Sequence, residues 1–182
     1  SGKYDLIPAN RDLAGAEIEM VNLPQRETRL KEALREVEGE YDFILIDCPP
    51  ALNLLTLNGL CAAHAVMIPM QCEYYALEGL SDLVNTIKKV RANLNPVLEI
   101  EGLLRTMFDP RNILAQQVSK QLQQHFGDKV YRTVIPRNVR LAEAPSFGIP
   151  ALYHDKLSKG TQAYLALAGE MLSRDSTNAA PV

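Results

Sequence analysis

The sequence predicts an α/β fold in which a mainly parallel, twisted sheet is flanked by helices. The first observation is a set of short apolar runs, each closed by proline or a turn: residues 43–46, 65–69, 98–108 and 130–135. Such runs are typical of strands that are buried on both faces of a parallel sheet. The second observation is that helical stripes alternate with these runs, which predicts β-α-β units with right-handed crossovers. With 182 residues and 47% hydrophobic content, the chain is long enough for one full core.

Before its central strand, the chain is expected to form a strand at residues 4–8 and helices at residues 12–21 and 25–37. Asp12 is a candidate N-cap for the first of these helices. The central strand is expected at residues 43–46. It must stop before Pro49 and Pro50, because proline cannot donate to a sheet ladder.

After the prolines, the expected elements are a helix at 52–63, a strand at 65–69, a loop at 70–79 running into a helix to about residue 94, a strand at 98–108, a helix at 113–126 and a strand at 130–135. Residues 137–153 are expected to be an irregular functional loop, because they are too long and too apolar for a linker. A final helix is expected from Ser158, a candidate N-cap, to Leu172. We therefore expect one α/β domain over residues 1–172 and a flexible tail over residues 173–182.

Asp47 follows the central apolar run and is expected at the carboxyl end of a strand. Ligands of open α/β sheets bind at this edge. An aspartate there is well placed to hold Mg²⁺, directly or through water, beside a nucleotide phosphate. The alternative is that Asp47 only leaves the strand and caps a turn. The pattern alone does not separate the two.

The composition excludes several classes of protein. A net charge of −3 and a pI of about 5.6 argue against a surface that is basic throughout. No apolar run approaches the roughly 20 residues of a membrane span, and the first residues given do not have the pattern of a signal peptide. The cysteines Cys48, Cys61 and Cys72 form no CxxC pair and are expected to be small buried apolar residues. Their odd number, without a disulfide framework, suits the reducing cytosol, so we expect a cytoplasmic protein. Because no run is long enough for a membrane span, we expect no membrane partner.

Positive charge is concentrated in one part of the chain. Between residues 103 and 140, two aspartates oppose seven basic residues: Arg105, Arg111, Lys120, Lys129, Arg132, Arg137 and Arg140. This segment therefore carries +5 in a chain whose total is −3. Such asymmetry indicates a polyanion partner, bound through phosphate contacts that ignore sequence. The alternative is a solvated surface on which these charges do not cluster.

Four segments resemble one known family. They are YDFILIDCPPALNLLTLN, PMQCEYYALEGL, TMFDPR and VIPRNVRLAEAPSFG, and they occur in the order found in the ParA/Soj chromosome and plasmid partitioning ATPases. The resemblance extends from about residue 4 to residue 172. The related MinD ATPases are similar too, but the PRNVRLAEAPS segment looks like ParA. The resemblance implies a P-loop NTPase-like fold, and an enzyme that forms a homodimer around Mg-ATP and binds DNA without sequence preference.

The resemblance also implies roles for individual residues. Asp47 takes the position of the Walker B aspartate that orients Mg²⁺ through water. The tripeptide Cys48-Pro49-Pro50 lies in the switch that senses the γ-phosphate. Gln71 and Glu73 match positions near the nucleotide and the dimer interface, although Glu73 could simply cap the following helix.

Two further sets of residues follow from the resemblance. Thr106 and Met107 end the strand that approaches adenine, and the loop that closes over the base matches Pro136, Arg137 and Asn138. Arg111 and Arg140 match arginines that bind DNA in relatives, and both belong to the +5 segment. A centromere-binding ParB-type partner is expected to stimulate hydrolysis, and the protein is expected to associate with the nucleoid.

The sequence departs from the family in one large respect. No segment matches the phosphate loop GxxxxGK[ST], whose N–H groups and lysine cradle the phosphates. The chain therefore looks like the C-terminal two-thirds of a family member, lacking the N-terminal Walker A unit. A shortened protein and a naturally degenerate copy are both open. We expect the full-length protein to hydrolyse ATP, and this chain alone to bind no cofactor and to be inactive.

Two other functions are alternatives to the partitioning ATPase. One is a nucleotide-independent module that binds DNA or a partner on the same fold. The other is a MinD-like regulator at a membrane, which predicts a basic amphipathic helix at the C-terminus. Residues 173–182 do not have that pattern.

Overall fold

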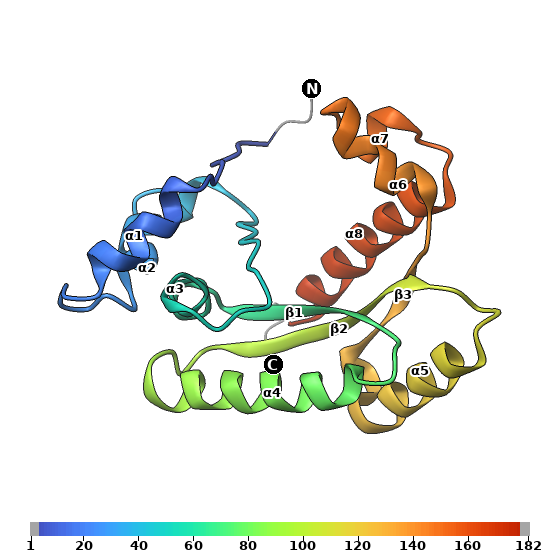
Figure 1. The fold of residues 1–182 in the computed structure, drawn as a ribbon, viewed down its shortest axis with the longest axis horizontal. Helices are drawn as coiled ribbons and strands as arrows, with labels where there is room; N and C mark the ends of the chain where they lie inside the picture. The colour runs from blue at the N-terminus through green and yellow to red at the C-terminus, as the bar shows by residue number, and fades with distance from the viewer. Residues whose placement is uncertain (1–3, 179–182) are drawn as a thin grey trace. The chain divides into compact units, whose positions relative to one another are not determined.

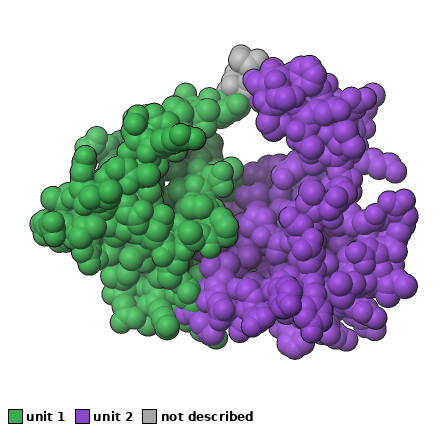
Figure 2. Space-filling view, viewed as in Figure 1, with its two compact units in different colours: residues 1–64, 86–99 green, residues 65–85, 100–182 purple. Residues whose placement is uncertain are grey.

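The structure is a computed structural model that describes the backbone of residues 4–178 and the side chains of residues 4–175. The chain divides into two compact units, which Figure 2 shows in different colours. Unit 1 comprises residues 1–64 and 86–99, and unit 2 comprises residues 65–85 and 100–182. Helix α4 (Ala76–Asn93) contributes to both. The expectation of one domain over residues 1–172 stays a prediction.

Unit 2 is built on a three-stranded sheet with the strand order β1-β2-β3 (Figure 1). Its strands are β1 (Ala65–Gln71), β2 (Glu99–Phe108) and β3 (Val130–Pro136), and β2 pairs with β3 in parallel. The predicted α/β class with a parallel sheet is confirmed. Pro69 lies inside β1 instead of ending it, which is possible because β1 is an edge strand of the described sheet.

The two faces of this sheet are covered by different helices. Leu104 of β2, Tyr131 and Ile135 of β3 and Leu167 of α8 (Lys159–Asn178) form a buried apolar cluster on one face. On the other face lies α5 (Ile113–Phe126), and Figure 1 shows α5 and α8 on opposite sides of the strands. The buried side chains of α5 are Ala115, Val118, Ser119 and Leu122. They recur at the three- and four-residue spacing of an amphipathic helix.

Polar caps fix the ends of these helices. The Oδ1 of Asn112 accepts from the N–H groups of Leu114 and Ala115 at the start of α5, and Gly127 ends the helix with a φ of 50°. At the start of α8, the Oγ of Ser158 accepts from the N–H of Thr161 at 3.2 Å. The predicted N-cap at Ser158 is thereby confirmed.

The segment expected to be an irregular loop at residues 137–153 is mostly helical turns. It forms α6 (Val139–Glu143), the 3-10 turn η3 (Ala144–Phe147) and α7 (Ala151–His154). Its prolines lie at turn starts, where the missing N–H costs nothing, and Gly148 takes a φ of 64° between η3 and α7. A further 3-10 turn, η2 (Gly127–Lys129), joins α5 to β3.

Unit 1 is helical in its regular parts. It contains α1 (Asp12–Met20), α2 (Arg29–Leu34), the turn η1 (Glu38–Glu40) and α3 (Leu54–Ala62). Asn58 of α3, which is 4% exposed, joins α2 to α3 by accepting from the N–H of Leu30 at 3.1 Å and donating to the carbonyl of Arg26 at 2.8 Å. Asn95 donates to the carbonyls of Leu60 and Ala63 at 2.9 and 2.8 Å.

Two predicted strands are absent from the described residues. Residues 4–8 and 43–46 have no regular secondary structure, and Leu45 is 81% exposed. A strand needs a neighbour to accept and donate its ladder hydrogen bonds, and neither segment pairs with a described strand. The expectation that all three cysteines are buried is wrong for Cys48, which is exposed, and right for Cys61 and Cys72.

Several helix boundaries also differ from the prediction. Asp12 is the first residue of α1 and not its N-cap, which is Arg11. The helix expected at 25–37 is shorter, Arg29–Leu34, and Gln25 cannot belong to it because its φ of 53° is left-handed. Helix α8 continues through Asn178, beyond the expected start of a flexible tail at residue 173. Arg174 holds this extension by donating to Val130 O and Glu170, and residues 179–182 lie outside the described part.

Among the described residues, no helix combines the length and the apolar character that crossing a bilayer requires.

Candidate functional site

The carboxyl ends of β2 and β3 meet at one edge of the sheet. Phe108 lies opposite Pro136 in the strand register, and the N–H of Arg137 donates to the carbonyl of Phe108 at 3.3 Å. The residue pair Thr106 and Met107 therefore comes beside the turn at residues 136–138. Two motifs that lie far apart in the sequence thus lie side by side at the edge where open α/β sheets bind ligands.

Met107 has an unusual backbone at this site. Its φ of 51° lies in the left-handed region, which residues other than glycine adopt at a cost of roughly 1–3 kcal/mol. Its side chain is 45% exposed. Residues in such conformations are frequent at ligand sites. They persist only where the surrounding structure imposes the strained backbone.

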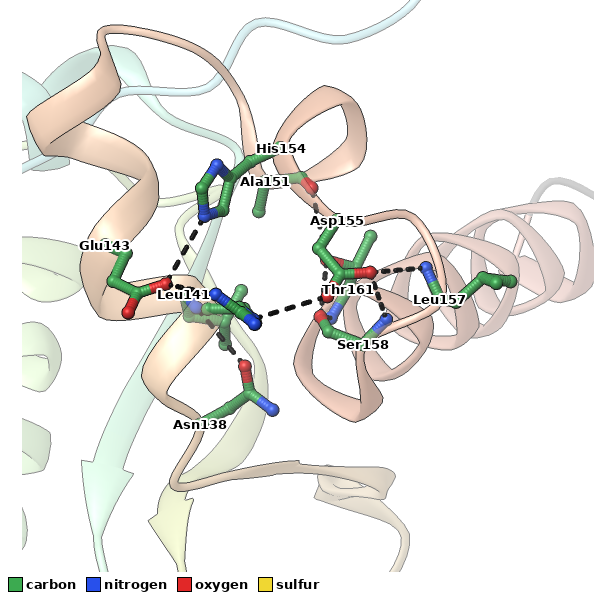
Figure 3. Close-up of polar contacts among 10 residues, drawn as sticks. Asn138, Leu141, Glu143, Ala151, His154, Asp155, Leu157, Ser158 and Thr161 are labelled. Atoms are coloured by element: carbon green, nitrogen blue, oxygen red, sulfur yellow. Dashed lines mark hydrogen bonds and ion pairs between the residues drawn. The ribbon is translucent and has the colours of Figure 1, made fainter.

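Asn138 has a structural task in the turn after β3. Its Oδ1 accepts from the N–H of Leu141 at 3.2 Å and so caps α6 (Figure 3). A Cβ at Gly160 would lie 2.5 Å from the Cγ of Leu141 and 3.0 Å from the Cβ of Asn138. Only glycine therefore lets the start of α8 approach this turn. In the sequence, the only indication of this close approach is that Gly160 lies at the start of the predicted final helix.

Arg140 is held by two carboxylates. It forms ion pairs with Glu143 at 2.9 Å and with Asp155 at 3.5 Å. Figure 3 shows Glu143 facing His154, whose Nε2 lies 3.5 Å from the same carboxylate, and His154 also stacks on Phe147. Hydrogen bonds from Arg140 and His154 lower the pKa of Glu143. The charge of Arg140 is therefore largely compensated within the 137–158 region.

Arg111 is also paired. Its guanidinium donates to both carboxylate oxygens of Asp109, at 3.0 and 2.8 Å, in a bidentate arrangement. These side-chain hydrogen bonds, with the backbone N–H of Arg111, lower the pKa of Asp109 to about 2. The Arg111 side chain is 88% exposed, so it remains accessible to a phosphate. Exposed ion pairs of this kind are weak and exchange readily for another anion.

One basic residue of the +5 segment is not on the surface. Arg105 is 6% exposed, and its guanidinium donates to Ser119 Oγ and to the carbonyls of Tyr131 and Arg132. Including Arg105 in a surface for polyanions was therefore wrong. The sequence does indicate an internal role for Arg105, because this residue lies within the apolar run that forms β2.

The end of β1 forms a shallow hollow. It is lined by Met70, Gln71, Glu73, Tyr74, Tyr75 and Ala76. Gln71 and Glu73 are exposed, and the two tyrosines pack edge to face with ring centroids 5.0 Å apart. The carbonyl of Glu73 accepts from the N–H of Ala76 at 3.1 Å, just as α4 begins. The roles of Gln71 and Glu73 near the nucleotide and the dimer interface stay predictions.

Asp47 lies in unit 1, in a segment without regular secondary structure. Its neighbours Ile46 and Cys48 pack on α3, where a Cβ at Gly59 would lie 2.9 Å from the Cys48 Sγ. The side chains of Asp47, Pro49 and Pro50 are exposed. Unit 1 thus presents the expected acid and switch prolines on an open segment.

The residues present fit the base of a Mg-nucleotide better than they fit its magnesium ion. Residues 136–138, with Thr106 and Met107, offer backbone groups at one edge of the sheet, which can form hydrogen bonds with the polar edge of a base. No cluster of three metal-ligating side chains occurs among the described residues. Asp47 alone would hold Mg²⁺ only together with phosphate oxygens and water.

Comparison with known proteins decides the family. A family model described as an AAA domain matches residues 1–100. The chain is 54% identical over 169 residues to the chromosome-partitioning ATPase Soj of Treponema pallidum, covering 93% of this chain and 67% of that protein. This chain belongs to the ParA/Soj family of partitioning ATPases.

Other ParA/Soj proteins give the same result. The sporulation initiation inhibitor Soj of Bacillus subtilis is 57% identical over 167 residues, which is 92% of this chain and 66% of that protein. The chromosome partitioning protein ParA of Caulobacter vibrioides is 55% identical over 173 residues, which is 94% of this chain and 65% of that protein. The chain thus spans about two thirds of the length of these relatives.

Solved structures share the fold. A cobyrinic acid a,c-diamide synthase of Mycobacterium smegmatis superposes with a TM-score of 0.75 at 38% identity, over 91% of this chain and 60% of that one. A plasmid partition protein of Borrelia burgdorferi gives 0.60 at 29% identity, over 73% and 53%. The synthase has also been solved with bound ADP and magnesium, in a structure that matches at a TM-score of 0.66 and 42% identity, over 72% and 54%. The predicted P-loop NTPase-like fold is confirmed.

Proposed function

We propose that this chain supplies the switch, the base-binding loops and the DNA-binding arginines of a Mg-ATP-dependent partitioning ATPase. The observation that carries the proposal is the meeting of Thr106 and Met107 with residues 136–138 at the carboxyl edge of the sheet. The full-length protein, meaning this chain joined to the phosphate loop of the family, hydrolyses ATP. The chain alone lacks the phosphate-loop pattern and is expected to be inactive.

In this proposal each segment has its own task. The carboxylate of Asp47 orients Mg²⁺ through water, and the metal supplies positive charge to the phosphates when it is bound. Pro49 and Pro50 give the switch a stiff backbone, because each fixes φ. The half-buried Thr106 and the turn at residues 136–138 hold the base.

The DNA-binding part of the proposal rests on Arg111 and Arg140. Both side chains are more than half exposed, and both lie in the segment of net positive charge. Phosphates would replace the carboxylates that now pair with them, so binding would ignore base sequence and weaken with salt. We expect a homodimer on the nucleoid, released when a ParB-type partner stimulates hydrolysis.

The test replaces Asp47 in the full-length protein. Asp47→Ala is expected to abolish Mg-dependent ATP hydrolysis while the far-ultraviolet circular dichroism and the thermal midpoint remain unchanged. Asp42→Ala, at an exposed aspartate of the same segment, is the matched control and should retain turnover. Unchanged turnover in Asp47→Ala would overturn the proposed role in holding Mg²⁺.

A second measurement addresses the alternative of a nucleotide-independent module. Calorimetric titration of the 182-residue chain with Mg-ATP is expected to show no saturable heat. Saturable binding would mean that these residues form a complete nucleotide site without a phosphate loop. If the full-length protein bound DNA equally with and without Mg-ATP, the nucleotide-independent module would be the better description.

A further inference from the structure

Strand β3 contains a bulge just before the candidate base site. Leu103 of β2 pairs with Val130, but Arg105, two residues later, pairs with Val134. Four residues of β3 therefore span the length that two residues of β2 occupy. A second irregularity follows, because three residues of β2 lead to the next pair, Phe108 with Pro136. Bulges of this kind redirect a strand and are frequent beside active sites.

The bulge is held on its α5 side by Arg105. The Nη2 of Arg105 donates to the carbonyls of Tyr131 and Arg132 at 2.8 and 3.2 Å. Its Nη1 donates to Ser119 Oγ of α5 at 2.9 Å. One buried guanidinium thus bonds to two successive carbonyl oxygens inside the stretch of β3 where the register shifts.

From the α8 side, the bulge is held by Glu170. Its two carboxylate oxygens accept from the N–H groups of Arg132 and Thr133, both at 2.8 Å. Burial acts to raise the pKa of Glu170, but the N–H donors of Thr133 and Arg132, together with Arg174, outweigh it and lower that pKa to about 2. The carboxylate therefore stays ionised and keeps both hydrogen bonds.

The register of β3 beyond the bulge depends on both side chains. Without them, two N–H groups and two carbonyls of a half-buried strand would lose partners, and a shorter path without extra residues would become favourable. Any such slip would move residues 136–138 along β2 and away from Thr106 and Met107. We propose that Arg105 and Glu170 are positioning residues for recognition of the nucleotide base, an inference that rests on the proposed function.

A purely structural role would have a different effect from a positioning role. If the two residues only stabilise unit 2, their loss lowers the affinity for every part of the nucleotide, or for none. If they position the base turn, their loss weakens contacts to the base and spares contacts to the phosphates. Mg-tripolyphosphate, which has phosphates and no base, separates the two cases.

The experiment measures the affinity of the full-length protein for Mg-ATP and for Mg-tripolyphosphate by calorimetry. In the Glu170→Gln variant, the amide NH₂ cannot accept from a backbone N–H, so one of the two hydrogen bonds from Arg132 and Thr133 is lost. We expect the affinity for Mg-ATP to fall about tenfold or more and the affinity for Mg-tripolyphosphate to stay the same. Asp175→Asn removes the same charge from an exposed position of α8 and should leave the ratio of the two affinities unchanged.

A second variant keeps the inference testable if Glu170→Gln is too unstable to purify. Arg105→Lys retains the cation but cannot reach Ser119 and both carbonyls at once, so the same fall in the ratio is expected. An unchanged ratio in either folded variant, or an equal fall in both affinities, would overturn the positioning role. If the unaltered protein showed no preference for Mg-ATP over Mg-tripolyphosphate, the proposed base site itself would be wrong, and this inference with it.

Discussion

Residues 43–46 and residues 130–135 are both predicted to be short strands that end near a proline, yet only the second segment, in β3, is a strand. In β3, Tyr131 is fully buried and Ile135 is 3% exposed, whereas Leu45 is 81% exposed. β3 has β2 as its neighbour, and the described residues give residues 43–46 no strand to pair with. The difference teaches that such a pattern records the capacity to be a central strand, and that a neighbour is needed to realise it.

The largest expected effect separates these two regions by stability. Leu104→Ala removes a side chain from the core beneath α8 and should lower the free energy of unfolding by about 2–5 kcal/mol. Leu45→Ala should change it by no more than about 0.5 kcal/mol. Urea unfolding of the 182-residue chain, followed by circular dichroism, measures both. Similar losses would mean that residues 43–46 are buried in solution, which would break the comparison.

The next prediction concerns close packing in unit 2. Gly160→Ala places a Cβ within 2.5 Å of Leu141, and the resulting shift of α6 or α8 should lower the free energy of unfolding by about 1–3 kcal/mol. Gly169→Ala lies on the same helix with nothing within 4 Å of the new Cβ. It should raise that free energy by up to about 1 kcal/mol through helix propensity. Thermal unfolding compares the pair, and a neutral Gly160→Ala would contradict the contact.

A smaller effect follows from the titration of Glu170. The folded-state pKa of about 2 lies below the unfolded value of 4.5, so its stabilisation is complete above pH 4.5 and is lost as the pH falls from 4.5 towards 2. After solvent screening is allowed for, the contribution is on the order of 1 kcal/mol. Urea midpoints at pH 5.5 and pH 3 should differ less in Glu170→Gln than in the unaltered chain. Equal pH dependence would show that Glu170 is not specially stabilised as an anion.

The smallest expected effect concerns Arg140. If phosphates compete with Glu143 and Asp155 for its guanidinium, the double variant Glu143→Gln, Asp155→Asn should bind DNA a few-fold more tightly, roughly 0.5–1 kcal/mol. Fluorescence anisotropy of the full-length protein with Mg-ATP at two salt concentrations measures this change.

The control for that experiment separates local competition from net charge. Asp128→Asn also removes a negative charge from the basic segment, but Asp128 forms none of the ion pairs with Arg140. It should tighten DNA binding less than either single variant, Glu143→Gln or Asp155→Asn. Equal tightening in all three would show that only the total charge matters.

Elements with local signals could be predicted from the sequence. The limits of α5 agree with the prediction at both ends, because Asn112 caps its start and Gly127 ends it. The limits of β2 agree with the prediction to within one residue, because a turn with proline lies on either side of it. The convergence of Thr106 and Met107 with residues 136–138 could be expected once both were taken as carboxyl ends of parallel strands.

Features that depend on distant partners could not be predicted. To predict the internal role of Arg105, one would have to know that β3 carries a bulge. The bulge is also bonded to Glu170, which belongs to a helix and lies more than thirty residues later. The ion pairs of Arg140 depend on how the 137–158 region folds back on itself. The helical turns within that region were hidden by prolines, which indicate both loops and helix starts.

Helix α8 contacts the same short stretch of chain at two points, with Gly160 against the turn after β3 and Glu170 on the bulge before it. Ten residues of helix separate these points, a distance of roughly 15 Å that cannot be adjusted without turning one contact away. Inserting a single residue between them would rotate the carboxylate by about 100° and detach it from the strand. Insertions and deletions during evolution should therefore be tolerated in the loops around α8 and rejected between Gly160 and Glu170. The length of this helical interval thereby fixes the position of residues 136–138.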